Sequence, residues 1–163
     1  MSDAARARLI AHLRDVQQRW RGLAADVGKE RMEQPGAMGD WTFKDVASHL
    51  TGWRRRTILR LRAAAAGEPE PPNPWPAELG DAEDDVINAW MHDRTKDDRL
   101  DAVLAEADGV YDDFIAVVET LPAELLTDPD RFGWMEGVAL ADGDFSGHLD
   151  EHEPDVRRWL ARA

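Results

Sequence analysis

Cysteine is absent from the 163-residue sequence, and tyrosine occurs once. Without cysteine the chain cannot form disulfides, bind zinc through thiolates or use a thiol nucleophile of its own. The absence is also typical of proteins that work in a reducing cytosol. Any sulfur chemistry would need a thiol that a second molecule supplies.

Long apolar runs are missing as well. No stretch approaches the roughly 20 consecutive apolar residues that a membrane-spanning helix requires. The first residues lead into a charged amphipathic pattern, which differs from that of a signal peptide. We therefore predict a soluble, cytoplasmic protein with no membrane partner.

Basic residues are scarce relative to acidic ones. The chain has 20 Lys and Arg residues against 33 Asp and Glu residues, a formal net charge of −13. This charge repels phosphate backbones, so nucleic acid is not an expected partner. The local basic run Arg54-Arg55-Arg56 is typical of a solvated helix face paired with nearby acids, and we assign it no functional role.

A single hydrophobic core is the simplest organisation for this chain. Its length is that of one domain, and 43% of its residues are hydrophobic, which is enough to build a core. We find no convincing strand alternation, internal repeat or sustained heptad in it. We therefore predict one domain that covers residues 1–163.

Apolar residues recur at spacings of three and four along most of the chain, as in amphipathic helices. These stripes predict principal helices at residues 4–27, 42–66, 97–120 and 144–161. A shorter helix is predicted at 81–92 and a helical turn at 121–126, with loops at 28–40 and 127–143. We expect Phe132, Trp134 and Met135 to pack the second loop onto the helices.

Capping residues and prolines set several helix boundaries. Thr42 can cap the second helix, and Asp45 favours the positive end of that helix. Four prolines between Glu68 and Trp75 exclude a regular helix and predict a surface crossover or lid. Pro154 lies inside the last helix, where we favour a kink over two separate segments. The predicted architecture is an all-α antiparallel four-helix bundle with a long crossover connection.

Three histidines are the best candidates for a functional centre. His148 and His152 are four residues apart, so their side chains lie on one face of the last helix. That face is the apolar one, which directs both side chains into the bundle. His49 flanks the apolar stripe of the second helix, and a modest rotation of that helix would direct it inward.

Two interpretations of these histidines remain open. Two imidazoles from one helix and a third from another can hold a divalent metal and leave positions for water or a thiol. Alternatively, they are buried structural histidines that bond to Tyr111, a carboxylate or water. We expect His12 to be a structural histidine of this kind and His92 to be solvated.

Acidic residues near the histidines have ordinary explanations. Asp45 could orient His49 as a hydrogen-bond acceptor, but its capping position explains it equally well. Asp150 is on the helical face opposite the histidines, where we expect it to be solvated. Glu151 is three residues from His148 and is a weaker candidate for a role at the centre.

Two segments of the chain resemble a known superfamily. Residues 41–53, WTFKDVASHLTGW, look like the second-helix signature of the DinB/YfiT-like superfamily, and residues 147–160, GHLDEHEPDVRRWL, resemble its last helix. With residues 98–104 and 121–126, their order resembles the ClbS/DfsB branch, which includes the colibactin self-protection protein. The resemblance covers most of the chain.

The resemblance implies both a fold and a chemistry. It implies a four-helix bundle, often a homodimer, with a metal site of one histidine on the second helix and two on the last. In this sequence those positions are His49, His148 and His152. Relatives include metal-dependent transferases that use mycothiol or bacillithiol, a mycothiol-dependent maleylpyruvate isomerase, and a protein that hydrolytically opens a reactive cyclopropane.

The sequence thus supports three hypotheses of different classes. The first is a metal-dependent hydrolase or thiol transferase that detoxifies an electrophilic small molecule, using zinc, nickel or iron and, for transfer, a low-molecular-weight thiol. Trp53, Trp90 and Tyr111 would then be walls of an apolar substrate pocket, with the proline-rich crossover over its mouth. The second is a non-catalytic protein that sequesters the same kind of compound. The third is an interaction module that uses the acidic surface.

Overall fold

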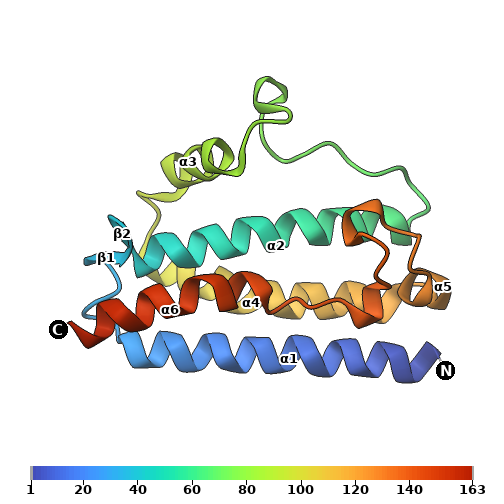
Figure 1. The fold of residues 1–163 in the computed structure, drawn as a ribbon, viewed down its shortest axis with the longest axis horizontal. Helices are drawn as coiled ribbons and strands as arrows, with labels where there is room; N and C mark the ends of the chain where they lie inside the picture. Colours follow the sequence, from blue (N-terminus) through green and yellow to red (C-terminus); the bar gives the residue numbers. More distant parts are fainter. Residues whose placement is uncertain (1, 163) are drawn as a thin grey trace.

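The computed structural model describes residues 2–162, which form a mostly helical structure. Its long helices lie alongside one another (Figure 1), and α4 contacts α1 and α2 while α6 contacts the same two helices from another side. These helices are α1 (Ser2–Val27), α2 (Phe43–Ala65), α4 (Leu100–Thr120) and α6 (Gly147–Ala161). The predicted all-helical class is therefore confirmed in its main feature. Within residues 2–162, no helix combines the length and apolar composition needed to cross a membrane.

Helix α1 buries the apolar stripe that its sequence predicts. Leu9, Leu13 and Val16 are almost completely buried. One turn further on, the Trp20 ring stacks on Phe43 at the start of α2, with 5.1 Å between ring centroids. Because both rings are large and buried, this contact fixes the start of α2 against α1.

A capping box starts α2, as predicted from the sequence. The backbone N–H of Asp45 donates to Thr42 Oγ1 at 3.1 Å, and the backbone N–H of Thr42 donates to Asp45 Oδ2 at 2.9 Å. These two bonds satisfy amides that the first helical turn leaves without partners. The cap sets the position from which His49 projects one turn later.

A small hairpin begins inside the loop predicted at 28–40 and ends just beyond it, which corrects the expectation that no strands form. Strands β1 (Pro35–Met38) and β2 (Trp41–Thr42) pair in antiparallel fashion. Gly39 provides the turn at a φ of +59°, a conformation that favours glycine. The strands are too short for an alternating pattern to indicate them in the sequence.

The proline-rich crossover leads from α2 to α3 (Asp84–Thr95) over the outer side of α2 (Figure 1). The crossover contains the short 3₁₀ helix η1 (Ala77–Leu79). Trp75, which precedes η1 in the crossover, is buried against the edge of Trp53. Helices α3 and α4 are separate, and each begins about three residues later than the sequence predicts. The predicted short helix and long helix are both present.

The connection between α4 and α6 is compact. It contains α5 (Ala123–Thr127) and two 3₁₀ helices, η2 (Gly133–Met135) and η3 (Leu140–Asp142). As predicted, Phe132 is buried, and Trp134 and Met135 pack on the core.

Helix α6 begins at Gly147, since Asp144 Oδ1 accepts bonds from the Ser146 backbone N–H and hydroxyl in a turn before it. The helix runs without interruption through Pro154, which excludes two separate segments.

Replacement of Phe43 by alanine tests the packing that positions α2. Phe43 is 0% exposed, so the Phe43→Ala variant should lose about 3–5 kcal/mol of unfolding free energy through lost burial and an internal cavity. Leu59 on the same helix is 40% exposed, and Leu59→Ala should cost at most about 0.5 kcal/mol. Urea denaturation measures both. Equal losses would contradict the burial pattern described for α2.

Candidate metal centre

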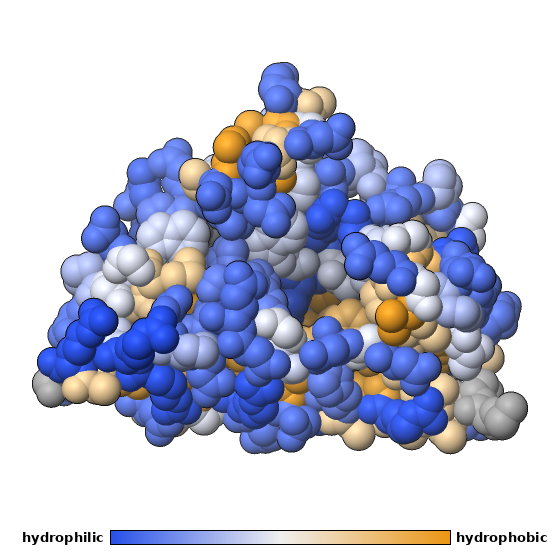
Figure 2. Space-filling model, viewed as in Figure 1, coloured by the Kyte–Doolittle hydropathy of each residue, from blue (hydrophilic) through white to orange (hydrophobic). Residues whose placement is uncertain are grey.

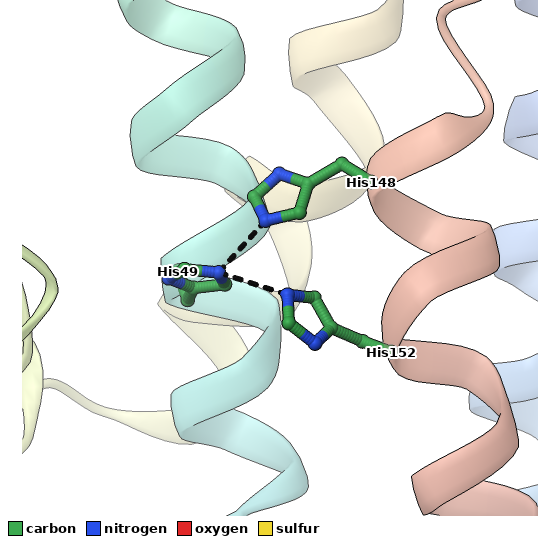
Figure 3. Close-up of side chains that lie close together, drawn as sticks. All are labelled: His49, His148 and His152. Atoms are coloured by element: carbon green, nitrogen blue, oxygen red, sulfur yellow. Dashed lines mark hydrogen bonds between the residues drawn. The ribbon is translucent and has the colours of Figure 1, made fainter. Parts of the chain in front are cut away.

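Three histidine side chains converge between α2 and α6 (Figure 3). His49 Nε2 lies 2.8 Å from His148 Nε2 and 3.1 Å from His152 Nε2. One potential ligand atom from each histidine lies within 4.8 Å of the other two. The three residues that the sequence singles out are therefore brought together.

The two helices supply these side chains from different local settings. His49 is 5% exposed and packs against the edge of Trp41, with 5.6 Å between ring centroids. His148 and His152 are one turn apart in the first half of α6 and are partly buried. The spacing of four residues places their rings one above the other, with 4.8 Å between centroids.

The number of protons at the centre does not suit three mutually bonded imidazoles. A neutral imidazole carries one N–H, and its other nitrogen offers a single lone pair. His49 Nε2 can therefore form a hydrogen bond with only one of the two Nε2 atoms that it contacts. A cation between the rings would accept a lone pair from all three nitrogens. The donor set therefore fits a metal ion.

The two separations between His49 Nε2 and the other Nε2 atoms are also those of a ligand set. Metal–nitrogen bonds of roughly 2.0–2.1 Å at tetrahedral or octahedral angles place neighbouring ligand atoms about 2.8–3.4 Å apart. The contacts of His49 at 2.8 and 3.1 Å are close to these separations.

Burial keeps the histidines uncharged. It lowers the pKa of His49 to about 4, with a further contribution from His152, and it lowers the pKa of His148 to about 3, helped by His49 and then His152. Burial also lowers the pKa of His152, although Glu151 and Asp155 oppose the shift. At pH 7 the three lone pairs are therefore free to bind a cation.

His49 is oriented by packing rather than by a carboxylate. Its Nδ1 atom is buried and has no hydrogen-bond partner among residues 2–162. For Asp45 the sequence left two roles open, orienting His49 or capping α2. Its Oδ2 atom caps α2. Its other oxygen lies 3.4 Å from His92 Nε2. Asp45 therefore serves the helix cap and His92.

A cleft of about 470 Å³ opens at the histidines. In Figure 2 this face of the molecule is hollowed between α3 and the long helices. The cleft is lined by the three histidines and by Trp53, Arg56, Thr57, Arg60, Asp84, Asp85, Asn88 and Glu151. Its walls carry charges of both signs, so the cleft is more polar than the apolar pocket that the sequence suggests.

Of the three aromatic residues predicted to form pocket walls, Trp53 lines the cleft. Its indole N–H donates to Asn88 Oδ1 at 2.8 Å, which fixes the ring between α2 and α3. Trp90 and Tyr111 are not among the lining residues. Trp90 packs beneath Arg94, and Tyr111 is fully buried inside the helices.

The two other histidines have structural roles. His12 Nε2 accepts the backbone N–H of Phe145 at 3.1 Å, which agrees with the expectation of a structural histidine. His92, by contrast, differs from its prediction: we expected it to be solvated, but it packs against another side chain. Its ring stacks on Trp41 with 4.7 Å between centroids. The helical pattern of α3 gave no sign of this contact because the hairpin that carries Trp41 was not predicted.

Two acidic residues differ in their relation to the site. Asp150 is exposed, but it also accepts bonds from Arg19 Nη2 at 2.5 Å and from Ser146 Oγ at 2.8 Å. The prediction that Asp150 is only solvated is thus incomplete, since it helps to tie α6 to α1. Glu151 is exposed and lines the cleft beside the histidines.

Asn88 and Arg56 are among the polar cleft residues that sequence reasoning missed. Arg56 lies over the Trp75 ring at 4.7 Å and over Trp53 at 5.6 Å, and its Nε donates to Asn73. Both residues depend on how the crossover folds back over α2. No local spacing in the sequence indicates that fold.

Comparisons of the chain with protein-family models, with curated proteins and with solved structures found no match. The functional assignment therefore rests on the residues of the chain and their geometry.

The burial of neutral histidines predicts acid sensitivity of the metal-free protein. The pKa of His148 is depressed when folded, so the unfolded chain takes up a proton below pH 6.5 that the folded chain does not bind. Between pH 7 and 5 this difference should remove about 1–2 kcal/mol of unfolding free energy. The His148→Gln variant should lose about 1–2 kcal/mol less unfolding free energy than the wild type between pH 7 and 5. Urea denaturation of both proteins at the two pH values measures this difference. His12→Gln is the control, and an equal acid loss in wild type and His148→Gln would contradict the burial of a neutral His148.

Proposed function

We propose that the chain is a metal-dependent enzyme with a DinB/YfiT-like four-helix-bundle fold, a hydrolase or thiol transferase that acts on an electrophilic small molecule. One observation carries the proposal: three uncharged imidazole nitrogens converge at the edge of a cleft. His49, His148 and His152 would hold the ion. The cellular role would be detoxification or self-resistance in the cytoplasm.

The arrangement of the long helices supports the assignment to this fold. Helices α1, α2, α4 and α6 pack along one another, and a long crossover connects α2 to α4 by way of α3. Helix α2 supplies one histidine of the centre and α6 supplies two. This distribution is the one that the resemblance in the sequence implies.

The chemistry follows from the residues around the centre. A divalent ion held there, such as zinc, nickel or iron, would supply a Lewis acid that lowers the pKa of water or of a thiol. Trp53 would contact the apolar part of the substrate, and Arg56 and Arg60 would attract negative charge on it. Because the chain has no cysteine, a thiol reactant would be a separate small molecule.

Metal content is the direct test of this proposal. Protein without a histidine tag, stripped of metal and reloaded, should bind one Zn²⁺, Ni²⁺ or Fe²⁺ ion per chain by elemental analysis. His152→Ala removes one of three ligands and should weaken binding by at least about tenfold. His12→Gln changes a histidine outside the centre and should bind metal as the wild type does.

Two results would contradict the metal centre. One is the absence of affinity for all three ions in the wild-type protein. The other is unchanged affinity in His152→Ala, which would place the ligands elsewhere.

Turnover separates the enzyme from a sequestering protein. With the metal loaded, the protein should consume a probe electrophile faster than the metal-free protein does. The probes are styrene oxide with water and 1-chloro-2,4-dinitrobenzene with cysteine as the thiol, and product formation is followed by chromatography. His49→Ala should react at the metal-free rate. Tight stoichiometric binding of a probe without product would favour the sequestering alternative.

A further inference from the structure

Arg54 contradicts the expectation that the basic run 54–56 is a solvated, acid-paired face. Its guanidinium carbon lies 4.6 Å from the centroid of the Tyr111 ring. The Nη2 atom of Arg54 and the hydroxyl of Tyr111 are both buried, and neither has a hydrogen-bond partner among residues 2–162. Arg54 is thus held by an aromatic face and leaves a buried donor without an acceptor.

Arg54 differs from the two arginines next to it in the sequence, because both of these bond to polar side chains; the Nε of Arg56 donates to Asn73 Oδ1. Arg55 bonds to Asp113, and Arg60 bonds to Glu70 at 2.7 Å. For Arg54 no ion pair with a carboxylate is found within residues 2–162. A buried cation without a counter-ion is costly, and a cation of this kind favours the binding of an anion from outside the chain.

A cavity of about 150 Å³ is lined in part by Arg54. Its walls are mainly aromatic, and Asp144 is the one acid among them. The Asp144 carboxylate is already bonded to the backbone N–H and hydroxyl of Ser146. The cavity is lined by Trp53, Arg54, Thr57, Phe114, Asp144, Phe145 and His148.

This cavity adjoins the cleft of the histidine centre. Trp53, Thr57 and His148 line both spaces. A molecule with one end at Arg54 therefore lies beside His148 and can extend toward the cleft. Burial raises the pKa of Tyr111, so its hydroxyl keeps its proton. Burial lowers the pKa of Arg54, but an arginine side chain is not deprotonated in proteins, so the guanidinium remains the charged group of the pair.

We propose that Arg54 binds the carboxylate of a small aromatic ligand in the cavity lined by Trp53, Phe114 and Phe145. The planar guanidinium suits a carboxylate because two N–H groups can bond its two oxygens. The aromatic walls suit an apolar ring, and Tyr111 is a positioning residue that supports the guanidinium from below. The net charge of −13 disfavours ligands with several negative charges, so a monoanion is preferred.

The proposal deepens the assignment of function in one respect. We infer further that the ligand with this carboxylate is the substrate of the histidine centre, and this part of the inference rests on the proposed function. The binding of the carboxylate by Arg54 does not, because no metal takes part in it. The two claims can therefore be tested separately.

The test uses metal-free full-length protein at pH 7.5, because a carboxylate could otherwise bind a metal ion directly. The probe is 4-fluorobenzoate, followed by fluorine NMR, with the uncharged 4-fluorobenzamide as its partner of nearly equal shape. Wild-type protein should bind 4-fluorobenzoate saturably and at least tenfold more tightly than the amide. Arg54→Met should lose at least tenfold in affinity for the carboxylate and keep its affinity for the amide.

Matched variants separate binding from folding. Arg55→Met removes a neighbouring arginine that pairs with Asp113 and should bind 4-fluorobenzoate as the wild type does. Arg54→Lys keeps the charge but loses the planar fork, so its affinity should lie between those of wild type and Arg54→Met. The ligand should raise the melting temperature of the wild type and of Arg55→Met but not that of Arg54→Met.

Several results would overturn the inference. They are equal affinities for the carboxylate and the amide, unchanged binding in Arg54→Met, or saturable binding lost equally in Arg55→Met. Metal binding at the histidines together with any of these would leave the proposed function intact. Arg54-dependent binding in a protein that takes up no metal would support this inference while the proposed function fails.

Discussion

The fold brings three uncharged imidazoles together where α2 meets α6, and the account of this protein depends on that contact. A proton on any one of them would place a positive charge in a poorly solvated site beside two other rings, which is why the pKa of His49 and that of His148 are low. Left neutral, each ring nitrogen has either one N–H or one lone pair, so His49 Nε2 can bond to only one of the two nitrogens that it contacts. A bound cation removes this mismatch.

Helix α6 is held in place by contacts on its other faces, so the histidines do not have to position it. The Trp159 ring lies against Gly36 of the hairpin, where a Cβ atom would come within 2.9 Å of the ring. Arg31 covers the same ring at 4.4 Å, and Arg19 of α1 bonds to Asp150 and Glu153. These contacts present His148 and His152 to His49 before any ligand binds, and such preorganisation is what a binding site requires.

Helical periodicity was enough to predict the long helices and the inward direction of His148 and His152. The capping box of Thr42 and Asp45 was equally readable, because its residues are close in sequence. The hairpin, the contact of His92 with Trp41 and the burial of Arg54 were not predictable in this way. Each depends on segments distant in sequence, and arginine is a residue type that is seldom buried without a partner. The unusual position of Arg54 is visible only once α4 brings Tyr111 beneath it.

The centre and the Arg54 cavity share the wall formed by Trp53, Thr57 and His148, so one molecule could contact both. The claim on which this picture depends is that the three histidines bind one ion. X-ray diffraction from zinc-loaded crystals, recorded on both sides of the zinc absorption edge, locates such an ion without reference to activity. The account predicts a single anomalous peak about 2.0–2.2 Å from a nitrogen of each of His49, His148 and His152. A zinc-loaded crystal with its peak elsewhere, and with the three imidazoles still in contact only with one another, would contradict it.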